Sequence, residues 1–177
     1  MKLFVGCGSS NSICEPYLSD CRALLKEVFQ THDLVFGASS SGIMGIAYEE
    51  AKKNQKRIIG ICTDMWKEDL KALDCTKEYS VSTILERTQK LEEESDVLLF
   101  LPGGMGTFVE LFSAIDRKRN KEFDKPIIIY NLNHYYDSLL TFLEKNYEEG
   151  FTSKKVKECY QVTTTVKETL AILNKNF

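Results

Sequence analysis

The chain has 177 residues, of which 43% are hydrophobic and 28% charged, and its formal net charge at pH 7 is −3. This length predicts one domain, residues 1–177, with a sizeable core. The net charge gives no general electrostatic reason to bind a nucleic acid polymer or a membrane surface. No segment approaches the length of a transmembrane helix, so we expect no membrane partner.

The six cysteines are spread through the chain without a Cys-x-x-Cys pair, and the two histidines lie far from any pair of cysteines in sequence. This spacing argues against a zinc site, and we expect no bound metal. We interpret the cysteines as reduced thiols of a cytoplasmic protein. The apolar stretch at the start of the chain is shorter than the hydrophobic region of a signal peptide, which favours a first β-strand there.

Residues 3–5 form this short strand, which runs into the loop Gly6-Cys7-Gly8-Ser9-Ser10-Asn11. A helix is expected over residues 17–31, because apolar residues recur on one helical face. A first strand followed by a Gly/Ser loop and a helix is the phosphate-facing opening of many doubly wound folds, although a Gly-x-Gly pair alone is common. This loop is therefore a first candidate for phosphate binding.

A second loop of small residues, 37–45, follows the predicted strand 33–36 and enters a helix over residues 43–53. Small side chains leave backbone N–H groups accessible at a helix start, as a phosphate site requires. The alternative is a flexible surface loop with a serine N-cap. The two interpretations are equally supported by this stretch alone.

Residues 57–62 are the third predicted strand, and residues 63–79 show no clear period. We expect the latter to form an irregular segment that covers the pocket. Trp66 lies in this segment and is able to stack on a nucleobase, although packing of a lone tryptophan within a loop is the favoured interpretation. A helix is expected over residues 83–95, where Thr83 and Glu86 match a capping box.

An unbroken apolar run, residues 97–101, is typical of a strand buried on both faces of a parallel sheet. It stops at Pro102, and the chain then turns through three glycines before a helical pattern begins. Apolar residues share one face of this helix, namely Phe108, Leu111, Phe112 and Ile115. A glycine turn between a strand and a helix directs backbone N–H groups and the positive end of the helix dipole at one spot, which favours an anion such as phosphate.

Thr107 and Glu110 lie three residues apart, so we expect neighbouring side chains on the first helical turn, away from the apolar stripe. One interpretation is a capping box, because Thr-x-x-Glu is its pattern. The other gives Thr107 a phosphate contact and Glu110 a chemical role. The preceding glycines favour the second, because a cap needs no glycine whereas close approach of a ligand to the backbone does.

The rest of the chain continues the alternation of strands and helices. This helix is expected to extend toward residue 121. The basic run at residues 116–119 is interpreted as a solvated face, with the lining of a partner subunit's pocket as the alternative. The later elements are a strand at 126–130, a helix from 135 to about 150, a strand at 161–163 and a helix at 166–174. The pattern predicts an α/β fold, a Rossmann-like doubly wound parallel sheet with helices on both faces. The three small-residue loops should meet outside the carboxyl ends of the strands, where such folds bind ligands.

Residues 102–110, PGGMGTFVE, resemble the PGGxGTxxE motif of the LOG family, the cytokinin riboside 5′-monophosphate phosphoribohydrolases, many of which are labelled possible lysine decarboxylases. Residues 7–10 are similar to the family's CGSS, residues 36–45 to YGGGxxGLMG, and the stretch from 125 to 151 to KPVxLLN…YYDxLL…EEGF. The chain departs from the family at Ala38 and Ser39, where the family has glycine. It departs again at Thr88, where the family has lysine.

The resemblance implies hydrolysis of the N-glycosidic bond of a nucleoside 5′-monophosphate, of the AMP or cytokinin riboside type, to free base and ribose 5-phosphate. It implies catalytic roles for Glu110 and Arg87, and the charge of Arg87 should keep Glu110 ionised. It also implies a homodimer, and we expect no cofactor. The residues expected to bind phosphate and nucleotide are Gly103, Gly104, Gly106, Thr107, Ser9, Ser10, Ser39, Gly42 and Met44.

The departures at Ala38, Ser39 and Thr88 motivate an alternative, a non-catalytic nucleotide-binding or sensing module that uses the same phosphate cradle. Lysine decarboxylase activity is not expected, because the sequence offers no recognisable lysine context for pyridoxal phosphate.

Overall fold

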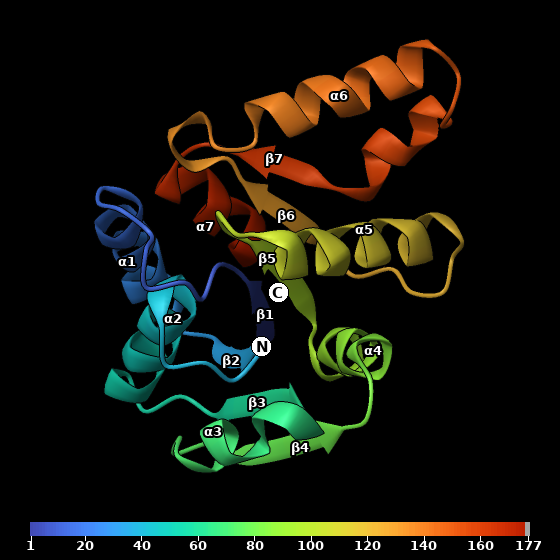
Figure 1. The fold of residues 1–177 in the computed structure, drawn as a ribbon. Helices are drawn as coiled ribbons and strands as arrows, with labels where there is room; N and C mark the ends of the chain where they lie inside the picture. The colour runs from blue at the N-terminus through green and yellow to red at the C-terminus, as the bar shows by residue number, and fades with distance from the viewer. Residues whose placement is uncertain (176–177) are drawn as a thin grey trace.

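The computed structural model describes residues 1–175 and is built on a sheet of seven parallel strands (Figure 1). The strands are β1 Lys2–Gly6, β2 Asp33–Phe36, β3 Ile58–Thr63, β4 Lys77–Val81, β5 Val97–Phe100, β6 Ile127–Tyr130 and β7 Gln161–Thr163. Their order across the sheet is β4-β3-β2-β1-β5-β6-β7. The predicted doubly wound parallel sheet is confirmed. The strand order reverses between β1 and β5, which places the expected ligand crevice at the carboxyl ends of these two strands.

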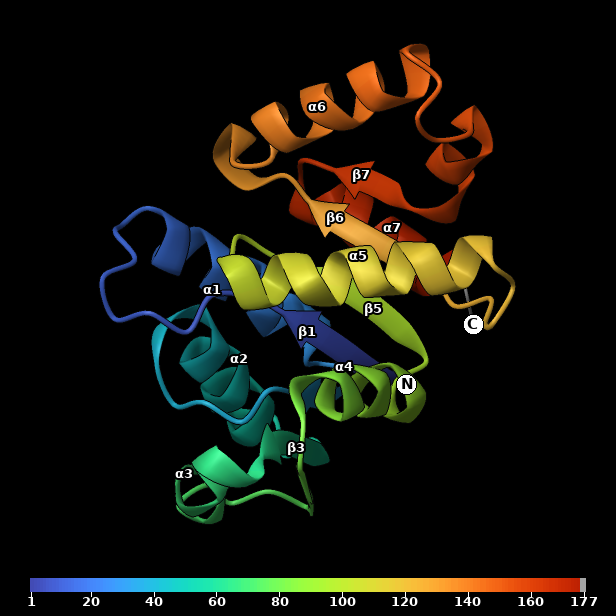
Figure 2. The same ribbon diagram turned by 45° about the vertical axis from the view of Figure 1, so that its right-hand side comes forward.

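The α-helices cover both faces of the sheet. They are α1 Tyr17–Val28, α2 Gly42–Lys53, α3 Lys67–Lys71, α4 Ile84–Glu94, α5 Met105–Arg119, α6 Asp137–Glu148 and α7 Val166–Lys175. Buried residues of α1, α2, α3 and α7 pack on one face, and those of α4, α5 and α6 pack on the other. Figure 2 shows α4 and α5 in front of the sheet on this second face. Three short 3-10 helices, Asp64–Trp66, Leu132–His134 and Lys154–Cys159, lie in the connections.

The central strands are covered on both faces, which explains why apolar and polar residues do not alternate in their sequences. All four residues of β5 and of β6 are buried, because helices cover the sheet on both sides. On the second face, the rings of Phe4 and Phe100 meet edge to face with their centroids 5.7 Å apart. The sheet therefore forms a rigid platform for the loops that leave its carboxyl edge.

The segment 63–79 is more ordered than its sequence predicts. It contains a 3-10 helix, the short helix α3 and the start of β4, which pairs in parallel with β3 from Lys77 to Val81. The irregular segment expected here was wrong for a physical reason: β4 is an edge strand whose residues are exposed or half-buried, so no apolar run marks it. The Thr83–Glu86 capping box is confirmed, with both of its hydrogen bonds formed.

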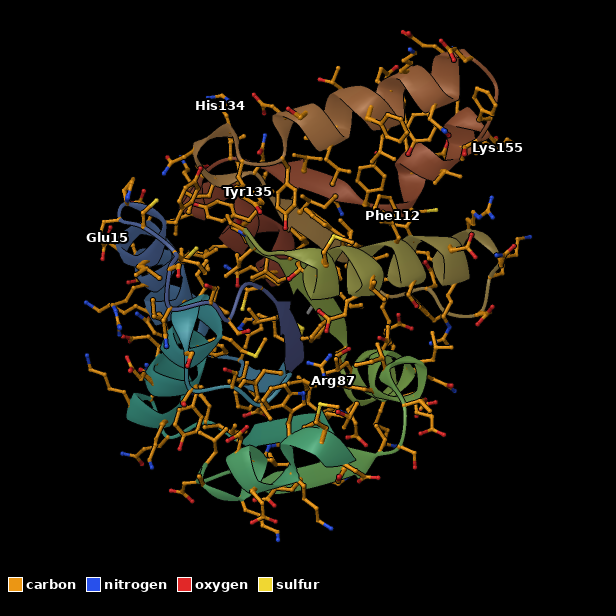
Figure 3. All side chains as sticks on the ribbon, viewed as in Figure 1. Glu15, Arg87, Phe112, His134, Tyr135 and Lys155 are labelled. Carbon is orange, nitrogen blue, oxygen red and sulfur yellow. The ribbon has the colours of Figure 1, made fainter. Side chains whose placement is uncertain are left out.

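The capping-box interpretation of Thr107 and Glu110 is excluded, and Phe112 does not lie on the buried face of α5, contrary to the prediction. The helix begins at Met105 with Gly104 as its N-cap, so Thr107 lies inside the first turn and forms no capping box with Glu110. The side chain of Phe112 is 40% exposed, whereas Thr107 and Glu110 are buried. Figure 3 shows Phe112 on the side of α5 toward α6. The polar pair thus faces the interior because neighbouring loops and α4 cover it, a contact that helical periodicity does not reveal.

The basic run at residues 116–119 is not simply a solvated face. Arg117 pairs with the buried carboxylate of Glu92 on α4 and with Glu122. Ser113 also donates a hydrogen bond to Glu92, at 2.8 Å. This cluster joins α4 to α5 and is a structural ion pair that the sequence did not indicate.

All six cysteines are free thiols. Within residues 1–175, no helix combines the length and the apolar character needed to cross a membrane.

Candidate functional site

The three small-residue loops meet at the carboxyl edge of the sheet. The backbone N–H of Gly8, after β1, donates to the carbonyl of Pro102, after β5, at 3.0 Å. The N–H of Met44, in the first turn of α2, donates to the carbonyl of Gly8 at 3.2 Å. The predicted convergence of these loops is confirmed, and it follows from the parallel sheet, since every strand ends at the same edge.

A cavity of about 480 Å³ opens between these loops, and we call it the first cavity. Its walls come from the loop after β1, the start of α2, the glycine turn, the first turns of α5, and residues of α1 and α4. Its lining includes most of the predicted site residues: Ser9, Ser10, Met44, Arg87, Gly103, Gly104, Gly106, Thr107 and Glu110. The sequence therefore identified the greater part of one continuous cavity.

The N-terminus of α5 forms one wall of the first cavity, and no side chain caps it. A Cβ atom built on Gly104 or Gly106 would meet no atom within 4 Å. Neither glycine has a positive φ, so neither packing nor backbone conformation explains them. What the two glycines provide is open space in front of the first-turn N–H groups, where an anion is stabilised by those groups and by the helix dipole. A side chain at either position would project into that space.

Gly103 has a different role in the turn. A Cβ atom there would lie 2.1 Å from Oγ1 of Thr107, so its lack of a side chain allows the turn to pack against this threonine. Thr107 lines the cavity beside the open helix end.

Glu110 and Arg87 form an ion pair inside the first cavity, with 2.8 Å between Nη1 of Arg87 and Oε1 of Glu110. The pair joins α4 to α5. Figure 3 shows Arg87 extending from α4 toward the middle of the molecule. Its Nε also donates to the carbonyl of Ile61 at 3.2 Å, and its Nη2 to the carbonyl of Gly37 at 3.4 Å. The orientation of the guanidinium is thus fixed by three acceptors, which lie on β3, on α5 and in the loop after β2.

Burial raises the pKa of the Glu110 carboxyl, and the charge and hydrogen bond of Arg87 offset only part of that rise. Arg87 therefore lowers the pKa of Glu110, as expected. The net pKa is nevertheless raised, whereas an arginine acting alone would have lowered it. The carboxyl is 5% exposed, which explains why desolvation dominates. A carboxyl with a raised pKa beside one fixed cation is a common feature of catalytic sites.

A second cavity, of about 550 Å³, lies beside the first and shares Ser9, Met44 and Arg87 with it. Its other walls are the loop after β2, residues 37–41, and the segment after β3. Ser39 lines this second cavity, not the first. Trp66 also lines it and is 55% exposed, so the expectation that this tryptophan packs within its loop is wrong.

Gly42 lies outside the lining of both cavities. Its φ is 57°, and a Cβ atom there would lie 2.7 Å from the carbonyl oxygen of Ser10. Glycine at this position is explained by a left-handed turn and by the packing of two loops.

The departures from the family motif have distinct structural consequences. Ala38 is buried with a φ of 59°, so an alanine occupies a left-handed conformation that glycine adopts more easily. Thr88 is buried, its hydroxyl donates to the carbonyl of Ile84 at 3.0 Å, and it lines neither cavity. The position that carries lysine in the family is thus, in this chain, a buried threonine away from both cavities.

Tyr135 is a site residue that our sequence reasoning did not select. Its ring lines the first cavity, and its hydroxyl donates to the carbonyl of Gly103 at 2.7 Å (Figure 3). The C=O of Gly103 and the N–H of Gly104 belong to one peptide plane, so fixing the carbonyl also fixes the N–H. The positive φ values of Asn133 and His134 shape the turn before it. The similarity of residues 135–140 to the family's YYDxLL was the signal that could have identified it.

Cys7 also lines the first cavity, but burial raises the pKa of its thiol, followed by the effects of Cys21 and Glu110. It is therefore protonated at neutral pH and unsuited to act as a nucleophile. In the described part of the chain, no group of three or more His, Cys, Asp or Glu side chains is placed to hold a metal ion.

Comparison with known proteins gives a consistent result. A family model described as "Possible lysine decarboxylase" matches residues 44–173. The chain is 31% identical over 169 residues to the cytokinin riboside 5′-monophosphate phosphoribohydrolase LOG3 of Arabidopsis thaliana, covering 94% of this chain and 79% of that protein. It is 30% identical over 176 residues to the probable phosphoribohydrolase LOGL2 of Oryza sativa, covering 98% and 72%.

Among solved structures, the molybdenum cofactor carrier protein of Chlamydomonas reinhardtii aligns with a TM-score of 0.66 at 18% identity, covering 98% of this chain and 96% of that one. At this identity the similarity concerns the fold alone.

Proposed function

The chain belongs to the LOG family, and we propose that it hydrolyses the N-glycosidic bond of a nucleoside 5′-monophosphate, releasing free base and ribose 5-phosphate. The named relatives support an enzyme of this type. The observation that carries the proposal is the position of the Arg87–Glu110 ion pair, inside a cavity that also contains the open N-terminus of α5. One end of this cavity suits a phosphate, and a buried carboxylate lies one helical turn away.

Glu110 supplies the chemistry in this proposal. As the bond between C1′ and the base nitrogen breaks, positive oxocarbenium charge develops on the ribose, and an ionised carboxylate stabilises that charge or attacks C1′ as a nucleophile. A water oxygen ends on C1′, and the base leaves with a proton. Arg87 orients the carboxylate, and its charge and hydrogen bond favour the ionised form against the effect of burial. In this arrangement Arg87 and Glu110 are the catalytic residues.

The 5′-phosphate is proposed to bind at the N-terminus of α5, where the backbone amides of Gly104 and Gly106 and the hydroxyl of Thr107 lie together. Gly103 and Tyr135 hold the turn that presents them. Ser9 and Ser10 contribute hydroxyl groups from the opposite loop, and Met44 an apolar contact.

The direct test is to incubate the protein with the 5′-monophosphates of adenosine, guanosine, cytidine, uridine and a cytokinin riboside, and to measure free base and ribose 5-phosphate by chromatography. We expect release from at least one monophosphate and at least about tenfold slower release from the matching unphosphorylated nucleoside, because the phosphate contacts are lost. The same samples, given lysine, should yield no cadaverine. Absence of base release from every monophosphate would contradict the proposal.

The alternative of a non-catalytic nucleotide-binding module receives less support. Of the departures that motivate it, Thr88 lines neither cavity, and Ala38 and Ser39 line only the second cavity, away from Glu110. Decarboxylation through pyridoxal phosphate is also poorly supported, because that cofactor is held by a lysine Schiff base. None of the residues lining the two cavities in the described chain is a lysine.

A homodimer is the proposed assembly. Met105, Val109 and Phe112 are exposed on α5 at helical spacing, so they form one apolar stripe beside the mouth of the first cavity. A second copy covering this stripe would remove it from water. Sedimentation equilibrium at micromolar concentration should give twice the mass of the chain, and Val109→Glu should shift the protein to monomer. A monomeric wild type under these conditions would contradict the assembly.

A further inference from the structure

The second cavity is adjacent to the ion pair, but neither the N-terminus of α5, where phosphate is proposed to bind, nor Glu110 lines it. It meets the first cavity at Arg87, whose guanidinium lines both. Glu110 lines only the first of the two. The bond that Glu110 acts on therefore lies near the junction, and any part of the substrate beyond Arg87 enters the second cavity.

The order of groups along α5 sets the direction of the substrate. Thr107, at the phosphate end, precedes Glu110 by one helical turn. In a nucleoside 5′-monophosphate, the ribose separates the phosphate from the base. With the phosphate at Thr107 and C1′ at Glu110, the base projects away from the helix N-terminus. Arg87, the partner of Glu110, lines both cavities, so the second cavity is a neighbouring space that the base can enter.

The wall of the second cavity suits a flat polar ring. Trp66 is the single tryptophan of the chain, and its indole is 55% exposed although it lines a cavity. An indole is a large π-surface that stacks well on nucleobases, whatever their identity. Ser39 and Thr63 supply hydroxyl groups, and Leu73 supplies an apolar surface. Oγ of Ser39 already accepts a hydrogen bond from the N–H of Ser41 at 3.2 Å, so it is its O–H that can donate to a polar ring.

We propose that the second cavity is the nucleobase subsite and that Trp66 is its stacking surface. This inference rests on the proposed function, because it assumes a nucleotide with its phosphate at α5. It adds a base-binding residue from the segment after β3, in a cavity that the glycine turn does not line.

The single tryptophan provides a direct experiment. In a Glu110→Gln variant, which should bind substrate but hydrolyse it about 10²–10³-fold more slowly, the fluorescence of Trp66 is followed during titration with AMP and with ribose 5-phosphate. Stacking of adenine on the indole should quench the emission saturably. Ribose 5-phosphate occupies only the first cavity and should leave the emission unchanged, while isothermal calorimetry shows that it binds.

A second measurement uses Trp66→Ala in the same background, with Met65→Ala as matched control. Met65 lies in the same 3-10 helix and is 82% exposed, but it lines neither cavity. Loss of stacking should raise the Kd for AMP by about 5- to 100-fold, the effect of removing one base-stacking aromatic ring. The Kd for ribose 5-phosphate should change less than about twofold in both variants, and Met65→Ala should bind AMP as the parent does.

The outcomes separate the subsite from the proposed function. AMP binding by calorimetry without quenching, or an unchanged Kd for AMP in Trp66→Ala, would overturn the subsite while leaving the proposed reaction intact. Failure of AMP, and of the other four monophosphates, to bind would overturn both. Base release by the wild-type protein is measured independently and does not depend on Trp66.

Discussion

Glu110→Gln is expected to lower the turnover of a nucleoside 5′-monophosphate by about 10²–10³-fold, the effect of removing one preorganised electrostatic group from a buried site. Glutamine has nearly the same shape and still accepts a hydrogen bond from Arg87, so only the negative charge is lost. Steady-state kinetics should show the loss in kcat, with KM changed little, because the charge acts on the transition state. A kcat within threefold of wild type would contradict the catalytic role of Glu110.

The pH profile provides a second readout of the same substitution. Activity requires the ionised carboxylate, so kcat of the wild type should fall as pH decreases through the pKa of Glu110. Because burial raises that pKa, the acid limb should lie above the pKa of an exposed glutamate. The residual activity of Glu110→Gln should lack this limb. The comparison with wild type is needed because the substrate phosphate itself titrates near pH 6.

The chain contains a matched control for this substitution. Glu92 is also a buried glutamate paired with an arginine, but it lies between α4 and α5 and lines neither cavity. Glu92→Gln should lower the free energy of unfolding by about 1–3 kcal/mol, because Arg117 and Ser113 lose a charged partner. Its kcat, measured below the unfolding transition, should remain within about threefold of wild type. A kcat loss in both variants would indicate that the effect arises from destabilisation.

Much of this fold could be predicted because its signals are local. Unbroken apolar runs mark β5 and β6, since both faces of each strand are covered. The glycine turn between β5 and α5, where the phosphate is proposed to bind, could be recognised because it depends only on adjacent residues. The convergence of three loops follows from topology alone, because parallel strands end at one edge.

The features that could not be predicted depend on tertiary neighbours. Thr107 and Glu110 are buried by segments distant in sequence, so the apolar stripe of α5 did not locate them. The pKa of Glu110 depends on how far burial outweighs Arg87, and sequence shows only that the arginine is present. Trp66 was expected to pack, but the short elements around it leave its indole on a cavity wall.

Gly37 packs against the guanidinium of Arg87, and Gly37→Ala is the second substitution with a large expected effect. A Cβ atom at this position would lie 1.9 Å from Nη2 of Arg87 and 3.1 Å from its Cζ. The guanidinium is the far end of a flexible side chain, so it can move aside without a shift of the backbone. Moving it weakens the charged hydrogen bond to Glu110, which contributes about 1.5–3 kcal/mol. We therefore expect kcat to fall by about 10- to 100-fold, and the free energy of unfolding to fall by no more than the contribution of this hydrogen bond.

A double-mutant cycle separates this mechanism from a general loss of structure. If Gly37→Ala acts only by displacing Arg87, it should have no further effect once the guanidinium is absent. The double variant Gly37→Ala, Arg87→Ala should then match the kcat of Arg87→Ala alone. Additive losses would mean that the alanine disturbs the loop after β2 directly. Non-additivity would show that Gly37 is a glycine because it allows Arg87 to lie flat against the backbone and reach the carboxylate on α5.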